Sequence, residues 1–128
     1  SNEHELEMLD NALPIIKKLL VVLLDNDVSS IMGFFRHDVY RYFFLLTFMV
    51  EYFEGSEISQ EHAISLVPQK YASRIKRLQV LKQAVELGYI IEESSTVDKR
   101  RRIYSPSAEL VLEFLDGANN INDIFNKS

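Results

Sequence analysis

The hydrophobic pattern of this chain is helical over most of its length and changes for one short stretch after Gly88. Elsewhere apolar side chains recur at steps of three and four positions, which is the spacing of a helix with one buried face. Tyr89–Glu93 is instead rich in β-forming residues, Ser94–Lys99 is polar, and Arg101–Ser105 can form a returning strand. The sequence therefore predicts a mainly α fold with one small β-hairpin.

The first expected helix is amphipathic and covers Glu3–Asp25, with leucine and isoleucine at helical spacing. Pro14 favours a kink or a split within it. Asp25–Asp27 is expected to form a turn. The stretch from Leu13 to Leu24 contains two lysines and is too short to span a bilayer, so we expect a cytoplasmic protein without a secretory leader.

The second expected helix begins after a cap at Ser29 or Ser30 and runs to about Phe53. It is aromatic on more than one face, which favours a central core helix over a ligand pocket. Gly55 is a natural residue to end it.

A pair of helices joined by a tight turn is expected next. Ser59 can cap a helix over Gln60–Leu66, Val67–Gln69 is a turn, and a longer helix covers Lys70–Leu87 before Gly88 ends it. This is a helix-turn-helix pattern. The apolar positions of its second helix are Tyr71, Ile75, Leu78, Leu81 and Val85.

After the hairpin, Pro106 and Ser107 can start a short helix over Ala108–Leu115. Gly117–Asn120 is expected to interrupt it, and Ile121–Phe125 can add a last turn. The whole chain, 1–128, is interpreted as a single winged-helix domain. Its N-terminal helices (3–55) provide core and dimerisation surface, 56–105 form the helix-turn-helix and hairpin, and 106–128 form the C-terminal helix.

The charge distribution is strongly asymmetric. The chain has a formal net charge of -5, yet Pro68–Tyr104 contains nine basic and four acidic residues, a net charge of +5, so the remainder carries -10. Lys99–Arg102 is an unbroken basic row at the expected hairpin tip. Local positive charge is what binding to a phosphate backbone requires, although a run of charge can also be only a solvated face.

A hairpin directly after a helix-turn-helix is the winged-helix arrangement. In it the second helix lies in the DNA major groove, and the hairpin, or wing, reaches the backbone or the minor groove, whose negative potential attracts arginine. "DKRRRIYS", Asp98–Ser105, resembles the wing of the MarR-type (multiple antibiotic resistance regulator) family, which typically reads Asp-x-Arg-x-Arg; Asp98, Arg100 and Arg102 match. "ELGYIIEES", Glu86–Ser94, resembles the preceding helix end and strand.

The resemblance implies that Asp98 braces an arginine and that Arg100 enters the minor groove. The resemblance also implies a homodimer built from the terminal helices. A small-molecule effector is expected on the resemblance only, since no residue pattern indicates one. Two features depart from the family pattern: Pro68–Gly88 is longer than the usual recognition helix, and Ser105-Pro106 stands where the family has Leu-Thr.

The sequence therefore predicts a dimeric DNA-binding transcriptional regulator that reads two half-sites about one helical turn apart. The alternative is a winged-helix protein-interaction module that does not bind DNA. Tyr71 can pack on the core or contact DNA. The expected DNA contacts from the recognition helix are Gln69, Lys70, Tyr71, Ser73, Arg74, Lys76 and Arg77. Those from the wing are Asp98, Lys99, Arg100, Arg101 and Arg102.

No residue pattern favours an enzyme, a metal site or a cofactor. The chain has no cysteine, and its four glycines are too scattered to form a phosphate-binding loop. His4, His37 and His62 do not share a metal-ligand spacing. Ser29, Ser59 and Ser73 have no nucleophile motif around them and are interpreted as helix caps or contacts.

Overall fold

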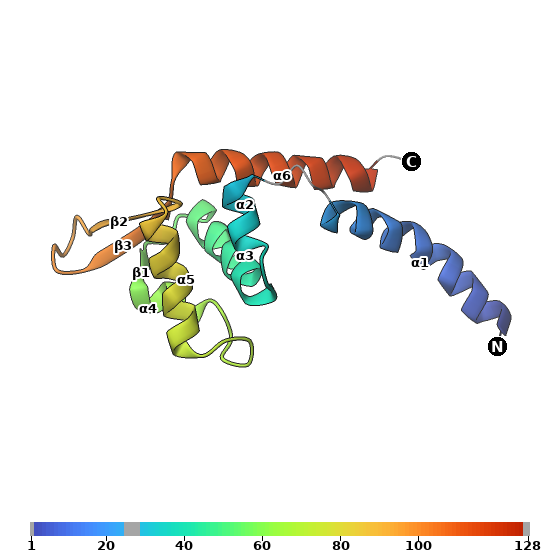
Figure 1. The fold of residues 1–128 in the computed structure, drawn as a ribbon, viewed down its shortest axis with the longest axis horizontal. Coiled ribbons are helices and arrows are strands. Elements are labelled where there is room, and N and C mark those ends of the chain that lie inside the picture. The colour runs from blue at the N-terminus through green and yellow to red at the C-terminus, as the bar shows by residue number, and fades with distance from the viewer. Residues whose placement is uncertain (1, 25–28, 127–128) are drawn as a thin grey trace. The chain divides into compact units, whose positions relative to one another are not determined.

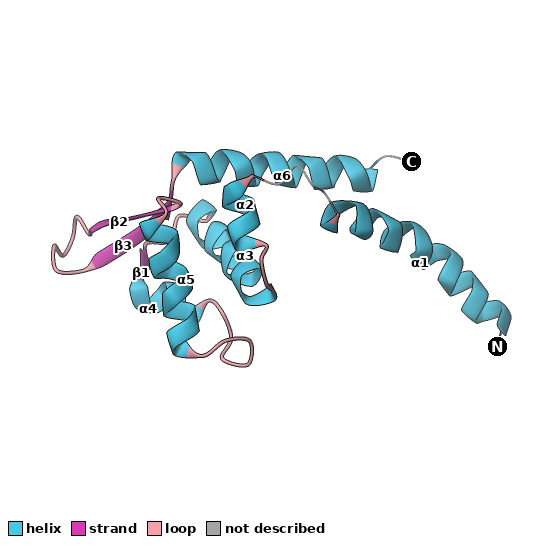
Figure 2. Ribbon diagram, in the orientation of Figure 1, coloured by secondary structure: helices cyan, strands magenta, loops and turns pink. Residues whose placement is uncertain are grey.

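The computed structural model describes residues 2–24 and 29–126. These residues form helices and one small antiparallel sheet (Figures 1 and 2). The elements in chain order are α1 (Asn2–Leu23), α2 (Ser30–Phe35), α3 (Val39–Phe53), β1 (Ile58–Ser59), α4 (Gln60–Ser65), α5 (Arg74–Glu86), β2 (Ile90–Ser94), β3 (Arg102–Pro106) and α6 (Ala108–Asn126). The predicted fold class is confirmed.

The chain divides into two compact units. One contains Ser1–Val28 and Phe114–Ser128, and the other contains Ser29–Glu113. The second unit holds the predicted helix-turn-helix and hairpin. The prediction that the whole chain is one domain stays a prediction.

The aromatic segment forms two helices, so the prediction of one helix to Phe53 was wrong. The Ser29 side chain accepts a hydrogen bond from the Met32 amide and caps α2, as predicted. Asp38 then takes an extended conformation and accepts a hydrogen bond from the Arg41 amide at 3.1 Å, which starts α3. A short acidic side chain competes well for free amides at a helix start, and here it outweighs the continuous hydrophobic pattern.

The core of the second unit is aromatic. Phe35, Phe44 and Phe48 are completely or almost completely buried. The rings of Phe35 and Phe44 lie 6.4 Å apart, and those of Phe44 and Phe48 lie 5.4 Å apart. Burial of each such side chain contributes about 1.5–3 kcal/mol to folding. The prediction that this segment is core is therefore confirmed.

The helix-turn-helix is formed by α4 and α5. Ser59 caps α4 through the His62 amide, and Gly88 ends α5 in a left-handed conformation, both as predicted. The prediction that the second helix starts at Lys70 was wrong, because α5 starts at Arg74. The Ser73 backbone is extended, and its hydroxyl accepts a hydrogen bond from the Lys76 amide at 3.3 Å. The apparent excess length of the recognition helix is therefore a loop.

The sheet has the strand order β1-β3-β2. The hairpin pairs Ser94 with Arg102 and Glu92 with Tyr104, one residue from the predicted strand bounds. Strand β1 was not predicted, because two residues are too few to show an alternating pattern. Its pairing of Ile58 with Tyr104 attaches the hairpin to the start of α4.

In the first unit, α1 continues through Pro14, so the helix is not split. The predicted interruption of α6 at Gly117–Asn120 was wrong, since α6 continues to Asn126. A helical glycine costs only about 1 kcal/mol, and an Asn126–Asn122 side-chain hydrogen bond of 2.8 Å supports the last turn. The Lys18 ammonium donates a hydrogen bond to the Phe125 carbonyl at 3.1 Å. The predicted turn at Asp25–Asp27 lies outside the described residues.

Candidate nucleic-acid interface

The outward face of α5 differs from the predicted one. The buried side chains are Arg77, Val80, Leu81 and Ala84. At 100° per residue, the middle of the opposite face falls on Ile75, Gln79, Lys82 and, in the last turn, Glu86, all exposed. Ile75 was predicted to face the core and is instead 70% exposed. Lys76 is exposed at the edge of this face, in agreement with its predicted position.

Arg77 was placed on the outer face by the sequence analysis, and this placement was wrong. The residue is only 8% exposed. Its Nη1 donates hydrogen bonds to the carbonyl oxygens of Ile64 at 2.9 Å and Val67 at 3.2 Å. These carbonyls lie at the end of α4 and just after it, where the backbone lacks helical partners. Arg77 therefore holds the turn between the two helices and is not exposed to a ligand.

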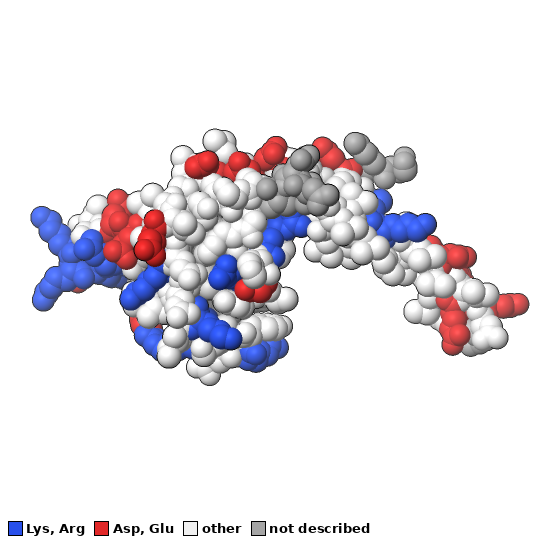
Figure 3. All heavy atoms as spheres, viewed as in Figure 1, with Lys and Arg blue, Asp and Glu red and all other residues white. Residues whose placement is uncertain are grey.

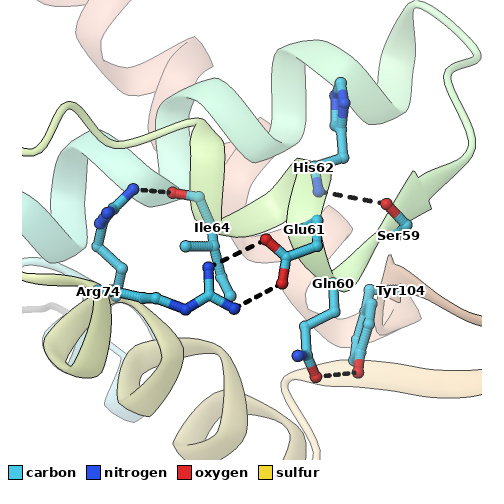
Figure 4. Close-up of polar contacts among 8 residues, drawn as sticks. Ser59, Gln60, Glu61, His62, Ile64, Arg74 and Tyr104 are labelled. Carbon is cyan, nitrogen blue, oxygen red and sulfur yellow. Dashed lines mark hydrogen bonds and ion pairs between the residues drawn. The ribbon is translucent and has the colours of Figure 1, made fainter.

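Arg74 joins the two helices from outside. Its guanidinium forms hydrogen bonds of 2.6 and 3.0 Å to the two carboxylate oxygens of Glu61 (Figure 4). The hydrogen bond from Arg74 lowers the pKa of Glu61, and the same hydrogen bond raises the pKa of Arg74. Both side chains are exposed, so water and salt weaken the pair. Arg74 lies on the surface, as predicted, and its positive charge is paired with the Glu61 carboxylate.

The other predicted contacts of the recognition helix lie before α5. Gln69, Lys70 and Tyr71 belong to the connecting loop, where the Tyr71 amide bonds to the Pro68 carbonyl at 3.0 Å. The Tyr71 ring packs against Phe43 with a centroid distance of 5.7 Å and is still 46% exposed. Tyr71 thus packs on the core while keeping one side in solvent.

The wing tip is ordered by short-range hydrogen bonds. The buried Ser95 hydroxyl accepts from the amides of Val97 at 3.2 Å and Asp98 at 3.4 Å. Asp98 accepts from the Arg100 amide at 3.0 Å, and its carboxylate lies 3.9 Å from the Arg100 guanidinium. The Arg100 side chain is 97% exposed. Figure 3 shows the concentration of Lys and Arg at this end of the hairpin.

The other two wing arginines are also paired with carboxylates. Arg101 lies 3.8 Å from Glu57, and Arg102 lies 4.0 Å from Glu92. Glu92 also accepts a hydrogen bond of 2.7 Å from the Tyr104 hydroxyl. Burial of Tyr104, helped by that hydrogen bond, raises its pKa to about 12.

The wing and α4 share an open groove. It is lined by Ser59, Gln60, Glu61, Arg101 and Arg102. Figure 4 shows Gln60 pointing toward Tyr104 from the start of α4, and their side-chain oxygens are 3.5 Å apart. Hairpin and helix-turn-helix therefore form one continuous surface in this unit.

Two of the histidines, His37 and His62, lie close to carboxylates. His62 is 3.3 Å from Glu51, and His37 is 3.8 Å from Asp38. Within residues 2–24 and 29–126, no group of three or more metal-ligating side chains is present. Ser29, Ser59 and Ser73 all act as helix caps. In the described part of the chain no helix is long and apolar enough to cross a membrane.

Two groups of residues were not identified from the sequence. Ile75 and Gln79 were not assigned to the outer face, because Ile75 fits an apolar stripe with Leu78, Leu81 and Val85, whereas the buried side chains are those of Arg77, Val80, Leu81 and Ala84. The carboxylates of Glu57, Glu61 and Glu92 were not recognised as arginine partners. Glu61 and Arg74 are 13 positions apart on different helices, so no local spacing indicates their pairing.

Comparison with known proteins supports the fold. No protein-family model and no curated protein matches the chain. The solved structure of transcriptional regulator PA4135 is 14% identical and has a TM-score of 0.50, covering 75% of this chain and 71% of that one. The heme sensor protein PefR from Streptococcus agalactiae is 16% identical with a TM-score of 0.49, covering 95% of this chain and 76% of that one.

A third solved structure is the adhesin competence repressor AdcR from Streptococcus pyogenes. It is 11% identical with a TM-score of 0.44, covering 98% of this chain and 77% of that one. In the present structure, a helix-turn-helix precedes an antiparallel hairpin that is anchored by a third short strand. The chain has the winged helix-turn-helix fold that its sequence predicts.

Proposed function

We propose that this protein is a DNA-binding transcriptional regulator that acts as a homodimer. In this proposal α5 enters the major groove and the wing contacts the minor groove or the adjacent backbone. The observation that carries the proposal is the wing tip: Arg100 is almost fully exposed on a loop fixed by Ser95 and Asp98. An arginine held outward on a short protrusion matches the negative potential of a narrow minor groove.

Several of the basic residues are already paired with a glutamate. Arg74, Arg101 and Arg102 each lie within 4.0 Å of a glutamate. A phosphate must displace that glutamate before it can pair with the arginine. We therefore expect the first contacts to come from Lys76 and Lys82 on α5 and from Lys99 at the wing tip, together with Arg100, which lies 3.9 Å from Asp98 but is 97% exposed. Each neutralised phosphate releases counterions, so affinity must fall as salt rises.

The homodimer is supported by α1. Its large apolar side chains are exposed along its length, including Leu6, Leu13, Ile16 and Leu20, and none of its residues is buried. Exposed apolar area of this extent indicates a partner surface. A second copy supplies the same apolar surface, and the resulting two-fold symmetry gives two recognition helices for two half-sites. The effector allowed by the family resemblance stays a prediction.

The test is a fluorescence-anisotropy titration with random 30-base-pair duplex DNA at two salt concentrations, on protein sized by light scattering. A dimer that binds, and whose affinity falls steeply between the two salt concentrations, supports the proposal. Failure to bind at low salt overturns it and favours the protein-interaction module.

A further inference from the structure

Ile75 is an unusual residue for the face on which it lies. The other exposed side chains at the middle of this face are polar, whereas Ile75 is a β-branched apolar residue that is 70% exposed. It occupies the second position of α5, directly after Arg74 and two residues after the Ser73 cap. Its neighbour one helical turn later on the same face is Gln79, also exposed.

These two side chains have distinct partners among the bases. In the major groove only thymine presents a methyl group, and apolar side chains contact it. Glutamine can form two hydrogen bonds with adenine N6 and N7. The residues at the start of a recognition helix are those that reach base edges. The first turn of α5 carries no acidic residue that would repel the phosphates beside the groove.

We propose that Ile75 and Gln79 are the specificity-determining residues of this protein, with Ile75 on a thymine methyl and Gln79 on an adenine. This inference rests on the proposed function, because it requires α5 to lie in the major groove. Four residues of helix rise about 6 Å, and base pairs repeat about every 3.4 Å. The two contacts therefore fall on base pairs about two steps apart or closer, and each half-site contains at least one A·T pair under the start of α5.

Lys76 and Lys82 have a different role in this arrangement. Lys76 directly follows Ile75, and Lys82 lies three positions after Gln79. Their positive charges can pair with DNA phosphates. Their loss weakens binding to every sequence by a similar factor, whereas loss of Ile75 or Gln79 changes which sequence is preferred. A change in sequence preference therefore indicates contacts with bases, whereas a uniform loss of affinity indicates contacts with phosphates.

The experiment begins with selection of bound duplexes from a random 30-base-pair library by the full chain. Each thymine of a selected duplex is then replaced singly by deoxyuridine, which lacks only the methyl group. One replacement per half-site is expected to weaken binding by about fourfold, the factor for one buried methylene-sized group. Ile75→Ala is expected to bind the thymine and uracil duplexes equally, and Ile75→Val to retain part of the difference.

The Gln79→Ala variant completes the test. It is expected to lose at least about fivefold in preference for adenine at one position of the half-site, while its affinity for random DNA is kept. Leu87→Ala is the matched control, since Leu87 is an exposed apolar residue at the opposite end of α5. It should leave both preferences unchanged.

The possible outcomes distinguish failure of this inference from failure of the proposed function. Binding to random DNA with no uracil effect at any thymine, or with the same effect in Ile75→Ala, overturns the inference and leaves the proposed function standing. Absence of binding to any duplex overturns both. Loss of folding in Ile75→Ala, seen by circular dichroism, would place Ile75 in a structural role and also overturn the inference.

Discussion

Arg74 and Glu61 lie on the two helices of the helix-turn-helix and are joined by hydrogen bonds of 2.6 and 3.0 Å. The pair links α4 to the first residue of α5 on the surface that we propose contacts DNA. It also matches the charge of Arg74 with a carboxylate that a DNA phosphate would have to replace.

Glu61→Gln is expected to strengthen binding to random DNA. The substitution removes the carboxylate that competes with phosphate for Arg74, so one more phosphate contact forms and the slope of log affinity against log salt steepens by about 1. Titrations at four salt concentrations measure this slope. Glu3→Gln, on α1, removes the same charge elsewhere and should leave the slope unchanged; equal slopes in all three proteins would contradict the expectation.

Arg100→Ala is expected to weaken DNA binding at least tenfold, roughly the value of one or two charge-assisted contacts. The side chain is 97% exposed, so its removal should not change the urea midpoint of unfolding. Unchanged affinity in a folded Arg100→Ala protein would count against the wing contact.

Arg77→Met is expected to reduce stability rather than DNA recognition. Its guanidinium donates to the carbonyls of Ile64 and Val67 in a buried site. Methionine fills similar space but leaves both acceptors without this donor, at a cost of about 2–4 kcal/mol in the free energy of unfolding. Urea denaturation measures the loss. A change below roughly 0.5 kcal/mol, which is the usual effect of a surface substitution, would show that Arg77 does not hold the turn.

Tyr104 is expected to make stability depend on alkaline pH. Its pKa is raised to about 12 in the folded state from the usual 10, so folding favours the protonated phenol. The resulting stabilisation is fully present below pH 10 and is lost as the pH rises toward 12. Tyr104→Phe should remove this part of the pH dependence. Identical profiles of stability against pH for both proteins would contradict it.

Leu13→Asp is expected to separate the proposed dimer into monomers. A charge placed in the apolar surface of α1 would be buried at the interface without a partner. Light scattering over a range of concentrations gives the mass. Asn11→Asp, which adds the same charge at an exposed polar position of α1, should remain dimeric. A monomeric wild type would refute the dimer outright.

Much of the second unit could be predicted from local chemistry. Helix caps and turns depend on a residue's own backbone and its near neighbours, so they can be predicted from a short stretch of sequence. This holds for the Ser59 cap, for Gly55 and Gly88, and for the polar hairpin tip. The errors arose where capping competed with hydrophobic spacing. Asp38 and Ser73 each start a helix inside an apparently continuous helical pattern. One extended backbone residue, Ser73, was enough to move the start of α5 from the predicted Lys70 to Arg74.

The charge pattern was harder to interpret because pairing is tertiary. The basic row Lys99–Arg102 was identified, but Glu57 and Glu92 reach Arg101 and Arg102 only through the pairing of β1, β2 and β3. Arg77 was counted with the surface charges because its spacing fits a basic face. The burial of Arg77 follows from its hydrogen bond to a carbonyl of α4, a contact between two helices that the sequence does not show.

The Ser95 hydroxyl has a consequence for the thermodynamics of binding. By accepting from the amides of Val97 and Asp98 it fixes the loop that carries Arg100 before any partner arrives. The conformational entropy of that loop is lost when the chain folds and not again on association. A preorganised tip of this kind binds with a smaller entropic penalty than a disordered basic tail of the same charge.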